Sequence, residues 1–223
     1  MPRGAEFSIK ADYAQLVWPF VSTDVDRYFL TGFYVQKHPS GGALIVGTDG
    51  RSLGVFWDQF GEVKASAIIK LNKTTLAACA EDCTLVLTGD RAGVYQMWNK
   101  ETGEGILVAA QDAAVVEGDF PDWRQTIPML PTEPKLSTFA FTELKKFEKV
   151  RAFGSKIAFL RIFSTAPNRA AVVLTARDDF IGIIMPCVGI EENRMPQWMP
   201  RPSPVASDPL GDIAAAAFST YGT

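Results

Sequence analysis

The chain has 223 residues, of which 47% are hydrophobic and 21% are charged, and its formal net charge is −3. This composition excludes a globally disordered protein, and the length is sufficient for one large or two small folded domains. No run of about eighteen apolar residues occurs, so no membrane span is predicted. The charge excludes a protein that is basic throughout, but it is compatible with nucleic-acid binding through a local basic face.

The few residues that commonly carry catalysis or bind metal show no catalytic pattern. Cys79, Cys83 and Cys187 are odd in number and lack paired spacing, which predicts free thiols and a cytoplasmic location. The single histidine, His38, stands beside Pro39 in a predicted turn. The sequence contains no nucleophile elbow, Walker loop or metal-spaced cluster. We therefore expect neither an enzyme nor a cofactor or metal.

The first part of the chain predicts a strand, a helix and three further strands. Asp49-Gly50 separates two apolar runs and is a strong hairpin signal, because Gly50 tolerates positive φ. Pro19 ends the predicted helix. The expected elements are Phe7–Lys10, Ala11–Trp18, Tyr28–Val35, Ala43–Val46 and Leu53–Trp57.

The same order of elements recurs twice, with Asn72 and Thr142 as predicted helix N-caps. Residues 60–66 are expected to form a linker, residues 115–128 show no clear period, and Glu133-Pro134 marks a second linker. Three βαβββ units then begin near residues 7, 67 and 137, and such a period indicates an internally repeated architecture. The later elements are expected at Ala67–Leu71, Lys73–Glu81, Thr84–Thr88, Gly93–Trp98, Gly105–Ala110, Thr138–Phe141, Glu143–Phe153, Ile157–Phe163, Ala170–Ala176 and Phe180–Met185.

Four short motifs, in order along the chain, resemble one family. They are R-Y-F-L-T-G from Arg27, T-D-G-R-S-L from Thr48, G-D-F-P-D-W from Gly118 with a following I-P, and I-I-M-P from Ile183. These motifs resemble those of the bacterial DNA polymerase III beta subunit, the sliding clamp. The resemblance implies an α+β fold with antiparallel sheets outside and helices inside. It also implies a clamp-like domain over 1–130 and a half domain over 131–190. The proline-rich composition of 191–223 predicts an extended or disordered tail.

The number of predicted units differs from that of the family. A full-length beta subunit has six such units and closes a ring as a dimer, whereas this sequence predicts three. An odd number leaves one unit without a partner in its own chain, and association is the usual way to cover its exposed face or sheet edge. We therefore expect a homo-oligomer, with a tetramer favoured by unit count. A shortened clamp of this kind would suit a phage or prophage.

The third predicted helix is the main candidate for duplex DNA binding without sequence preference. Leu144, Phe147 and Val150 fall on one side of a helical wheel, and lysines occupy the other. Family resemblance implies that such helices present cations to phosphates, although an ordinary solvated face would give the same pattern. The first helix carries Asp12 and no base, so the lining is less basic than expected. The candidate DNA-binding residues are Lys145, Lys146, Lys149, Lys73, Lys70, Arg27 and Tyr28.

The resemblance also implies a hydrophobic pocket that binds short peptides from a DNA polymerase or clamp loader. The basic residue of the family's T-D-G-H-R-L segment stands one place earlier here, at Arg51. The same residues could instead serve only the hairpin and core. The candidate pocket residues are Leu30, Thr48, Gly50, Arg51, Leu53, Pro128, Ile183, Met185 and Pro186.

Three functions follow as hypotheses. The first is a sliding-clamp-like processivity factor that self-assembles around DNA and binds replication proteins. The second is a clamp-derived adaptor or inhibitor that does not encircle DNA, and the third is an oligomeric scaffold with only architectural likeness to clamps. The tail is either floppy or anchored on a pocket or subunit through Met195, Trp198 and Met199.

Overall fold

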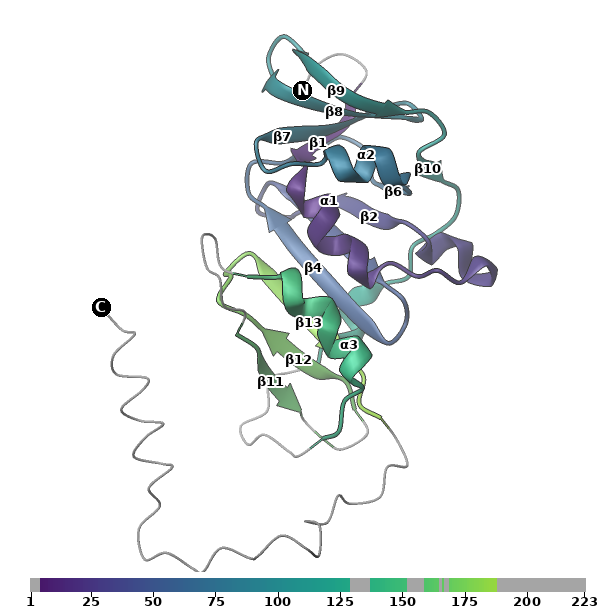
Figure 1. Cartoon of the computed structure of the whole chain (residues 1–223), viewed down its shortest axis with the longest axis vertical. Helices are drawn as coiled ribbons and strands as arrows, with labels where there is room; N and C mark the ends of the chain where they lie inside the picture. Colours follow the sequence, from purple (N-terminus) through teal and green to yellow (C-terminus); the bar gives the residue numbers. More distant parts are fainter. Residues whose placement is uncertain (1–4, 129–136, 152–158, 165, 167–168, 188–223) are drawn as a thin grey trace, which may run out of the picture. The chain divides into compact units, whose positions relative to one another are not determined.

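In the computed structural model, two antiparallel sheets and three short α-helices are described within the compact unit Met1–Val188 (Figure 1). The structure describes residues 5–128, 137–151, 159–164, 166 and 169–187. The tail with its predicted anchors lies outside this part of the chain, as do the boundary near residue 130 and part of the strand expected at 157–163. None of the helices in the described ranges is long and apolar enough to cross a membrane.

Each sheet contains strands from separate parts of the chain. The first has the order β5-β1-β7-β8-β9 and the second β10-β6-β2-β3-β4-β13-β12-β11. The strands of the first sheet are β1 (Ala5–Lys10), β5 (Glu62–Val63), β7 (Cys83–Thr88), β8 (Arg91–Asn99) and β9 (Glu104–Gln111). Those of the second are β2 (Phe33–Lys37), β3 (Ala43–Thr48), β4 (Ser52–Asp58), β6 (Ala67–Ile69), β10 (Val115–Val116), β11 (Arg161–Ser164), β12 (Ala171–Leu174) and β13 (Phe180–Ile184).

The first two groups of elements exchange their opening strands. β1 pairs with β7 and thus joins the three strands of the second group, whereas β6 pairs with β2 and joins those of the first. Each sheet therefore contains a strand from the other group. Neither sheet is therefore complete without both groups.

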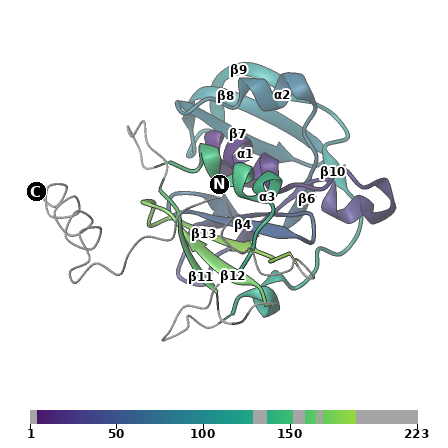
Figure 2. The same cartoon turned by 60° about the horizontal axis from the view of Figure 1, so that its bottom comes forward.

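The α-helices are α1 (Asp12–Val17), α2 (Lys73–Ala78) and α3 (Phe141–Lys145). Short 3-10 helices continue two of them, η1 (Trp18–Phe20) after α1 and η4 (Lys146–Lys149) after α3, and η1 contacts η4. Figure 2 shows α1 and α3 beside each other over the sheet that contains β4 and β13. Two further 3-10 helices, η2 (Val25–Leu30) and η3 (Trp123–Thr126), lie in connecting segments.

Alternating side chains of the second sheet enter two hydrophobic clusters on its opposite faces. On the helix face, Ile45 and Phe56 pack with residues of α1 and η4, in the larger core. On the other face, Val46 and Val55 pack in a smaller cluster, which Trp123 of η3 covers. The strands β3 and β4 are therefore buried on both sides, as their continuous apolar runs indicate.

The antiparallel pair β4–β13 joins the first and third groups of elements, and aromatic rings fill its centre. Gly54 lies opposite Gly182 in the register. A Cβ at Gly54 would lie 2.7 Å from Phe20, and one at Gly182 would lie 2.4 Å from Phe147. The Phe20 and Phe147 ring centroids are 5.0 Å apart. Glycine is thus needed on both strands, because each leaves room for a ring.

Several predicted element bounds were wrong. The strand expected from Tyr28 begins only at Phe33, because Asp24 accepts a hydrogen bond from the Asp26 N–H and opens η2, which Thr31 closes on the Tyr28 carbonyl. Short edge strands form in the expected linker 60–66 (β5) and in the aperiodic segment 115–128 (β10), where sheet pairing supplies structure that the sequence does not indicate.

The opening of the third group also differs from the prediction. Helix α3 starts at Phe141 after Ala140, which provides no side-chain cap, so Thr142 is not the N-cap, and η4 ends at Lys149. No strand forms over Thr138–Phe141: the Thr138 carbonyl accepts from the Cys187 N–H, and the Ala140 carbonyl accepts from the Glu143 and Leu144 N–H groups at the start of α3. The threefold βαβββ repeat and the three domain boundaries therefore stay predictions.

Candidate functional site

The turn between β3 and β4 is held by its own side chains. Gly50 has φ +86°, the left-handed conformation that the Asp-Gly signal predicts. One carboxylate oxygen of Asp49 accepts from the backbone N–H groups of Arg51 and Ser52, each at 2.9 Å. The Thr48 hydroxyl donates to the Ser52 carbonyl at 2.8 Å. This network fixes the shape of the exposed tip of the hairpin.

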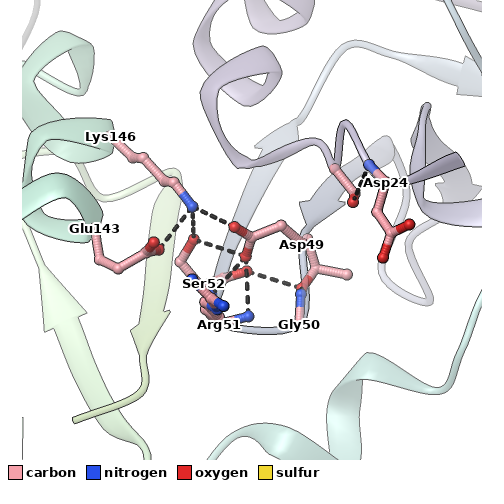
Figure 3. Close-up of polar contacts among 9 residues, drawn as sticks. Asp24, Asp49, Gly50, Arg51, Ser52, Glu143 and Lys146 are labelled. Atoms are coloured by element: carbon pink, nitrogen blue, oxygen red, sulfur yellow. Dashed lines mark hydrogen bonds and ion pairs between the residues drawn. The ribbon is translucent and has the colours of Figure 1, made fainter. Parts of the chain in front are cut away.

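Lys146 of η4 reaches the same turn from the third group (Figure 3). Its ammonium binds the second carboxylate oxygen of Asp49, the Ser52 hydroxyl at 3.0 Å and the Glu143 carboxylate at 2.6 Å. The Lys146, Asp49 and Glu143 side chains are only 18%, 19% and 11% exposed. Two half-buried carboxylates therefore share one cation, which links α3–η4 to the turn.

The pKa of Asp49 is lowered by its partners. Burial acts in the opposite direction and favours the neutral acid. The hydrogen bond from Lys146 and those from the Ser52 and Arg51 backbone outweigh burial, and the net direction is downward. The carboxylate is thus held in its charged form, as both sets of donors require.

The structure brings most of the predicted pocket residues together at this end of the β4–β13 pair. Leu53 pairs with Ile183, and the Met185 N–H donates to the Arg51 carbonyl at 2.8 Å. Leu53 and Ile183 are buried in the smaller cluster, Pro186 is buried, and Met185 is 43% exposed. An exposed thioether therefore lies beside a polar turn.

Two predicted pocket residues are placed less directly. Pro128 is half-buried and follows Ile127, which packs against the smaller cluster. Leu30 is buried outside both clusters, and its carbonyl accepts from the Ser22 N–H. Pro128 thus follows a residue that packs against the smaller cluster, whereas Leu30, the last residue of η2, belongs to neither cluster.

Segment 118–127, whose G-D-F-P-D-W motif was not predicted to contribute to the pocket, packs against the smaller cluster. Phe120 stacks on Tyr34 with ring centroids 5.0 Å apart, and Trp123 is buried against β4 and β13 side chains. Arg124 lies over the Trp123 ring at 4.5 Å. The two aromatic residues of the G-D-F-P-D-W motif, Phe120 and Trp123, were the sequence signal that this segment covers the smaller cluster.

The predicted DNA-binding lysines separate into different environments. Lys73 of α2 and Lys149 of η4 line one hollow of about 460 Å³ with Gln15 and Trp18. Lys70 and Lys145 are exposed. Lys146 does not belong to this exposed set, because two carboxylates bind its ammonium, and its assignment to the DNA-binding residues stays a prediction.

The other two DNA candidates, Arg27 and Tyr28, lie on η2. The Arg27 guanidinium bonds to Asp24 at 2.9 Å, and a Cβ at Gly50 would lie 2.7 Å from it. Tyr28 is 54% exposed and contacts Phe29 edge-on. The structure therefore places Arg27 against the candidate peptide-binding turn.

A second polar cluster lies at the opposite end of the β4–β13 pair. The Tyr13 hydroxyl of α1 donates to Asp179 at 2.7 Å, and Arg177 donates to the same carboxylate at 2.6 Å and 2.8 Å. Burial, followed by the Asp179 hydrogen bond, raises the pKa of Tyr13. The pKa of Asp179 is lowered, because Arg177 and Tyr13 outweigh its burial.

Strand β9 forms an edge of the first sheet and exposes consecutive apolar side chains. Ile106, Leu107 and Val108 are 58%, 48% and 47% exposed, and Met97 on neighbouring β8 is 82% exposed. Successive residues point to opposite faces of a strand, so β9 exposes apolar side chains on both faces at residues 106–108. A long apolar edge of this kind favours pairing with another chain.

Comparison with known proteins identifies the fold. No family model and no curated protein matches the sequence. Among solved structures, a DNA polymerase sliding clamp from Pseudomonas aeruginosa has a TM-score of 0.58 at 18% identity, covering 84% of this chain and 67% of its own. A P. aeruginosa clamp bound to griselimycin has a TM-score of 0.58 at 16% identity, covering 84% and 66%.

A beta subunit of DNA polymerase III from Thermotoga maritima has a TM-score of 0.53 at 13% identity, and the match covers 84% of this chain and 67% of its own. The chain therefore has a sliding-clamp fold. In particular, it resembles the bacterial DNA polymerase III beta subunits and spans about two thirds of their length. The predicted α+β, clamp-like fold class is confirmed.

Proposed function

We propose that this protein is a shortened clamp that tethers replication proteins to duplex DNA and has no catalytic activity. The observation that carries the proposal is the sliding-clamp fold over 84% of the chain. Three surfaces support it: the helix face with its lysines, the turn at the end of β4–β13, and the open edge of β9.

The helix face is the proposed DNA-binding surface. Lys73 and Lys149 come from different parts of the chain and converge on one hollow, and Lys145 is exposed on the neighbouring helix. Cations on a helical surface bind phosphates without reading bases, and this binding weakens as salt increases. Asp12 on α1 opposes it, although burial raises the pKa of Asp12.

The surface near Met185 and Arg51 is the proposed peptide pocket. Buried Leu53 and Ile183 provide an apolar floor, while Arg51 and the turn provide polar groups at its rim. Such a combination suits an extended peptide with hydrophobic anchors. Griselimycin, the compound bound to the P. aeruginosa clamp, is a suitable first probe of this surface.

Self-assembly is proposed to use the β9 edge. Three consecutive exposed apolar residues and an open row of backbone groups gain hydrogen bonds and burial when another strand pairs with them. We propose a tetramer of 24.4 kDa chains, about 98 kDa. A ring of twelve predicted units would need four copies.

The first experiment measures mass by light scattering on a sizing column, followed by retention on circular DNA. We expect a stable tetramer that stays on closed circles and is lost when the DNA is linearised, because a topological link ends at free ends. Ile106→Lys should reduce the mass, since a charged residue on an edge strand opposes pairing. A wild-type monomer at micromolar concentration would contradict the ring.

A matched pair of variants tests the helix face. Lys73→Glu with Lys149→Glu should weaken duplex binding and reduce the salt dependence by about one unit of slope per lost contact. Lys37→Glu with Lys64→Glu makes the same total charge change at two exposed residues outside the helices and should bind as wild type. Equal losses in both would indicate a nonspecific effect of net charge.

The alternative function is an adaptor that binds replication proteins without DNA. It is favoured by the low basicity of the helix face, where Asp12 and Gln15 stand on α1. Griselimycin binding by a protein that fails to bind circular DNA would support this alternative over the ring.

A further inference from the structure

Lys146 differs from its lysine neighbours in what it contacts. Lys145 and Lys149 are exposed, whereas the Lys146 ammonium contacts Asp49, Ser52 and Glu143, and its side chain is 18% exposed. A phosphate would have to compete with two carboxylates for this cation. Lys146 is therefore occupied within the protein.

The helix that carries Lys146 lies on the face of the sheet opposite the apolar floor of the proposed pocket. Phe147 and Val150 pack into the larger core on the helix face. Leu53 and Ile183 belong to the smaller cluster on the other face. Lys146 thus approaches the turn from behind that floor and can influence a bound peptide only through other residues.

Asp49 provides the connection. One of its oxygens binds Lys146, and the other accepts from the N–H groups of Arg51 and Ser52. The Arg51 carbonyl in turn accepts from the Met185 N–H. Hydrogen bonds therefore lead from Lys146 through Asp49 to the Arg51 and Ser52 backbone (Figure 3), and the Arg51 carbonyl extends the connection to Met185.

Removal of the cation would change the turn. Asp49 and Glu143 contact the same nitrogen atom, so the two carboxylates would repel each other without it. Rotation of Asp49 away from Glu143 would break its bonds to the Arg51 and Ser52 backbone. The turn would then lose its fixed shape.

We infer that Lys146 is a positioning residue: through Asp49, it holds the Thr48–Ser52 turn and the Met185 backbone in the geometry that binds a peptide. The inference rests on the proposed pocket and deepens it. It gives α3–η4 two separate roles, with Lys145 and Lys149 toward DNA and Lys146 toward the peptide-binding turn.

The first test is amide hydrogen exchange at Arg51 and Ser52, measured by NMR in the full chain. Lys146→Met should accelerate exchange about tenfold at these two amides, because a loss of 1.4 kcal/mol is tenfold in an equilibrium constant. Lys146→Arg should retain protection, and Lys145→Met, with the same charge change, should leave it unchanged. Unchanged exchange in Lys146→Met would overturn the inference.

The second test compares griselimycin and duplex DNA as probes. Lys146→Met should weaken griselimycin binding about tenfold and leave DNA affinity unchanged. Lys145→Met should weaken DNA binding and leave griselimycin affinity unchanged. Equal loss of DNA affinity in both variants would return Lys146 to the DNA-binding set and overturn its positioning role. If the wild type binds neither probe, the proposed function fails, and the exchange result still decides whether Lys146 positions the turn.

Discussion

The two ends of the β4–β13 pair use the same plan with different chemistry. At one end α3–η4 of the third group reaches the β3–β4 turn through Lys146, and at the other α1 of the first group reaches the β12–β13 turn through Tyr13. Each helix contacts a turn that belongs to the other group. The arrangement is approximately two-fold, as the opposed Gly54 and Gly182 also indicate.

The difference lies in where the cation comes from. Asp179 binds Arg177, two residues away in its own turn, and Tyr13 adds a neutral hydroxyl from α1. The cation that binds Asp49 is Lys146, which belongs to the third group of elements and lies 97 residues along the chain. The Asp179 turn is therefore charge-balanced locally, whereas the Asp49 turn depends on α3–η4. This dependence makes the Asp49 end the more sensitive to the position of the third group.

Removing the aromatic centre should have the largest effect, because it weakens both ends together. Phe147 is fully buried between Phe20 and Phe180. Phe147→Ala should cost about 3–5 kcal/mol in free energy of unfolding, measured by urea denaturation. A loss below about 1 kcal/mol would contradict its place at the centre.

Gly182→Ala should cost about 1–3 kcal/mol through overpacking, because the new Cβ would lie 2.4 Å from the Phe147 ring. Gly54→Ala tests the symmetry of the joint and should give a similar loss, by collision with Phe20. The Gly182→Ala/Phe147→Leu double variant should recover part of the stability if steric contact is the cause. Unfolding free energies from urea titrations check all three.

Lys146→Met should cost about 1–2 kcal/mol, since it leaves two half-buried carboxylates without a cation. In this variant the Arg51 and Ser52 amides should lose their protection from hydrogen exchange, whereas the amides of the Asp179 turn should keep theirs. Hydrogen exchange at both turns measures this difference. Equal loss at both ends would show that the third group moves as a whole.

Tyr13→Phe should cost about 1 kcal/mol, the value of one hydrogen bond, because Arg177 still balances Asp179. Thermal unfolding measures the change. An effect larger than that of Lys146→Met would contradict the conclusion that the Asp179 turn is balanced locally.

Acid should weaken both ends modestly. The folded pKa values of Asp49 and Asp179 are lowered, so their contribution is complete above the unfolded value of about 3.9 and is lost as pH falls through the folded pKa. Below about pH 4 the midpoint temperature should therefore decrease more steeply in wild type than in Asp49→Asn/Asp179→Asn. Parallel curves for the two proteins would contradict this assignment.

The sequence by itself determined the elements that depend on near neighbours. The Asp49-Gly50 hairpin needs only a glycine that accepts positive φ, and Asn72 caps α2 by accepting from the Thr75 N–H, as predicted. Alternating or continuous apolar runs were enough to locate most strands and the clamp-like order. An apolar pattern indicates which residues of a strand are buried, and this holds whichever element covers them.

Only the tertiary structure decided which strands and charges meet. The pairing of β4 with β13 joins residues more than 120 positions apart, and nothing in either strand specifies the other. Lys146 looked like its exposed neighbours, because a helical wheel separates polar from apolar faces but does not show what a polar face contacts. Only the folded structure places the carboxylate of Asp49 beside Lys146, which is 97 residues away in sequence. Long-range pairing therefore places a lysine that was predicted to face DNA between the carboxylates of Asp49 and Glu143.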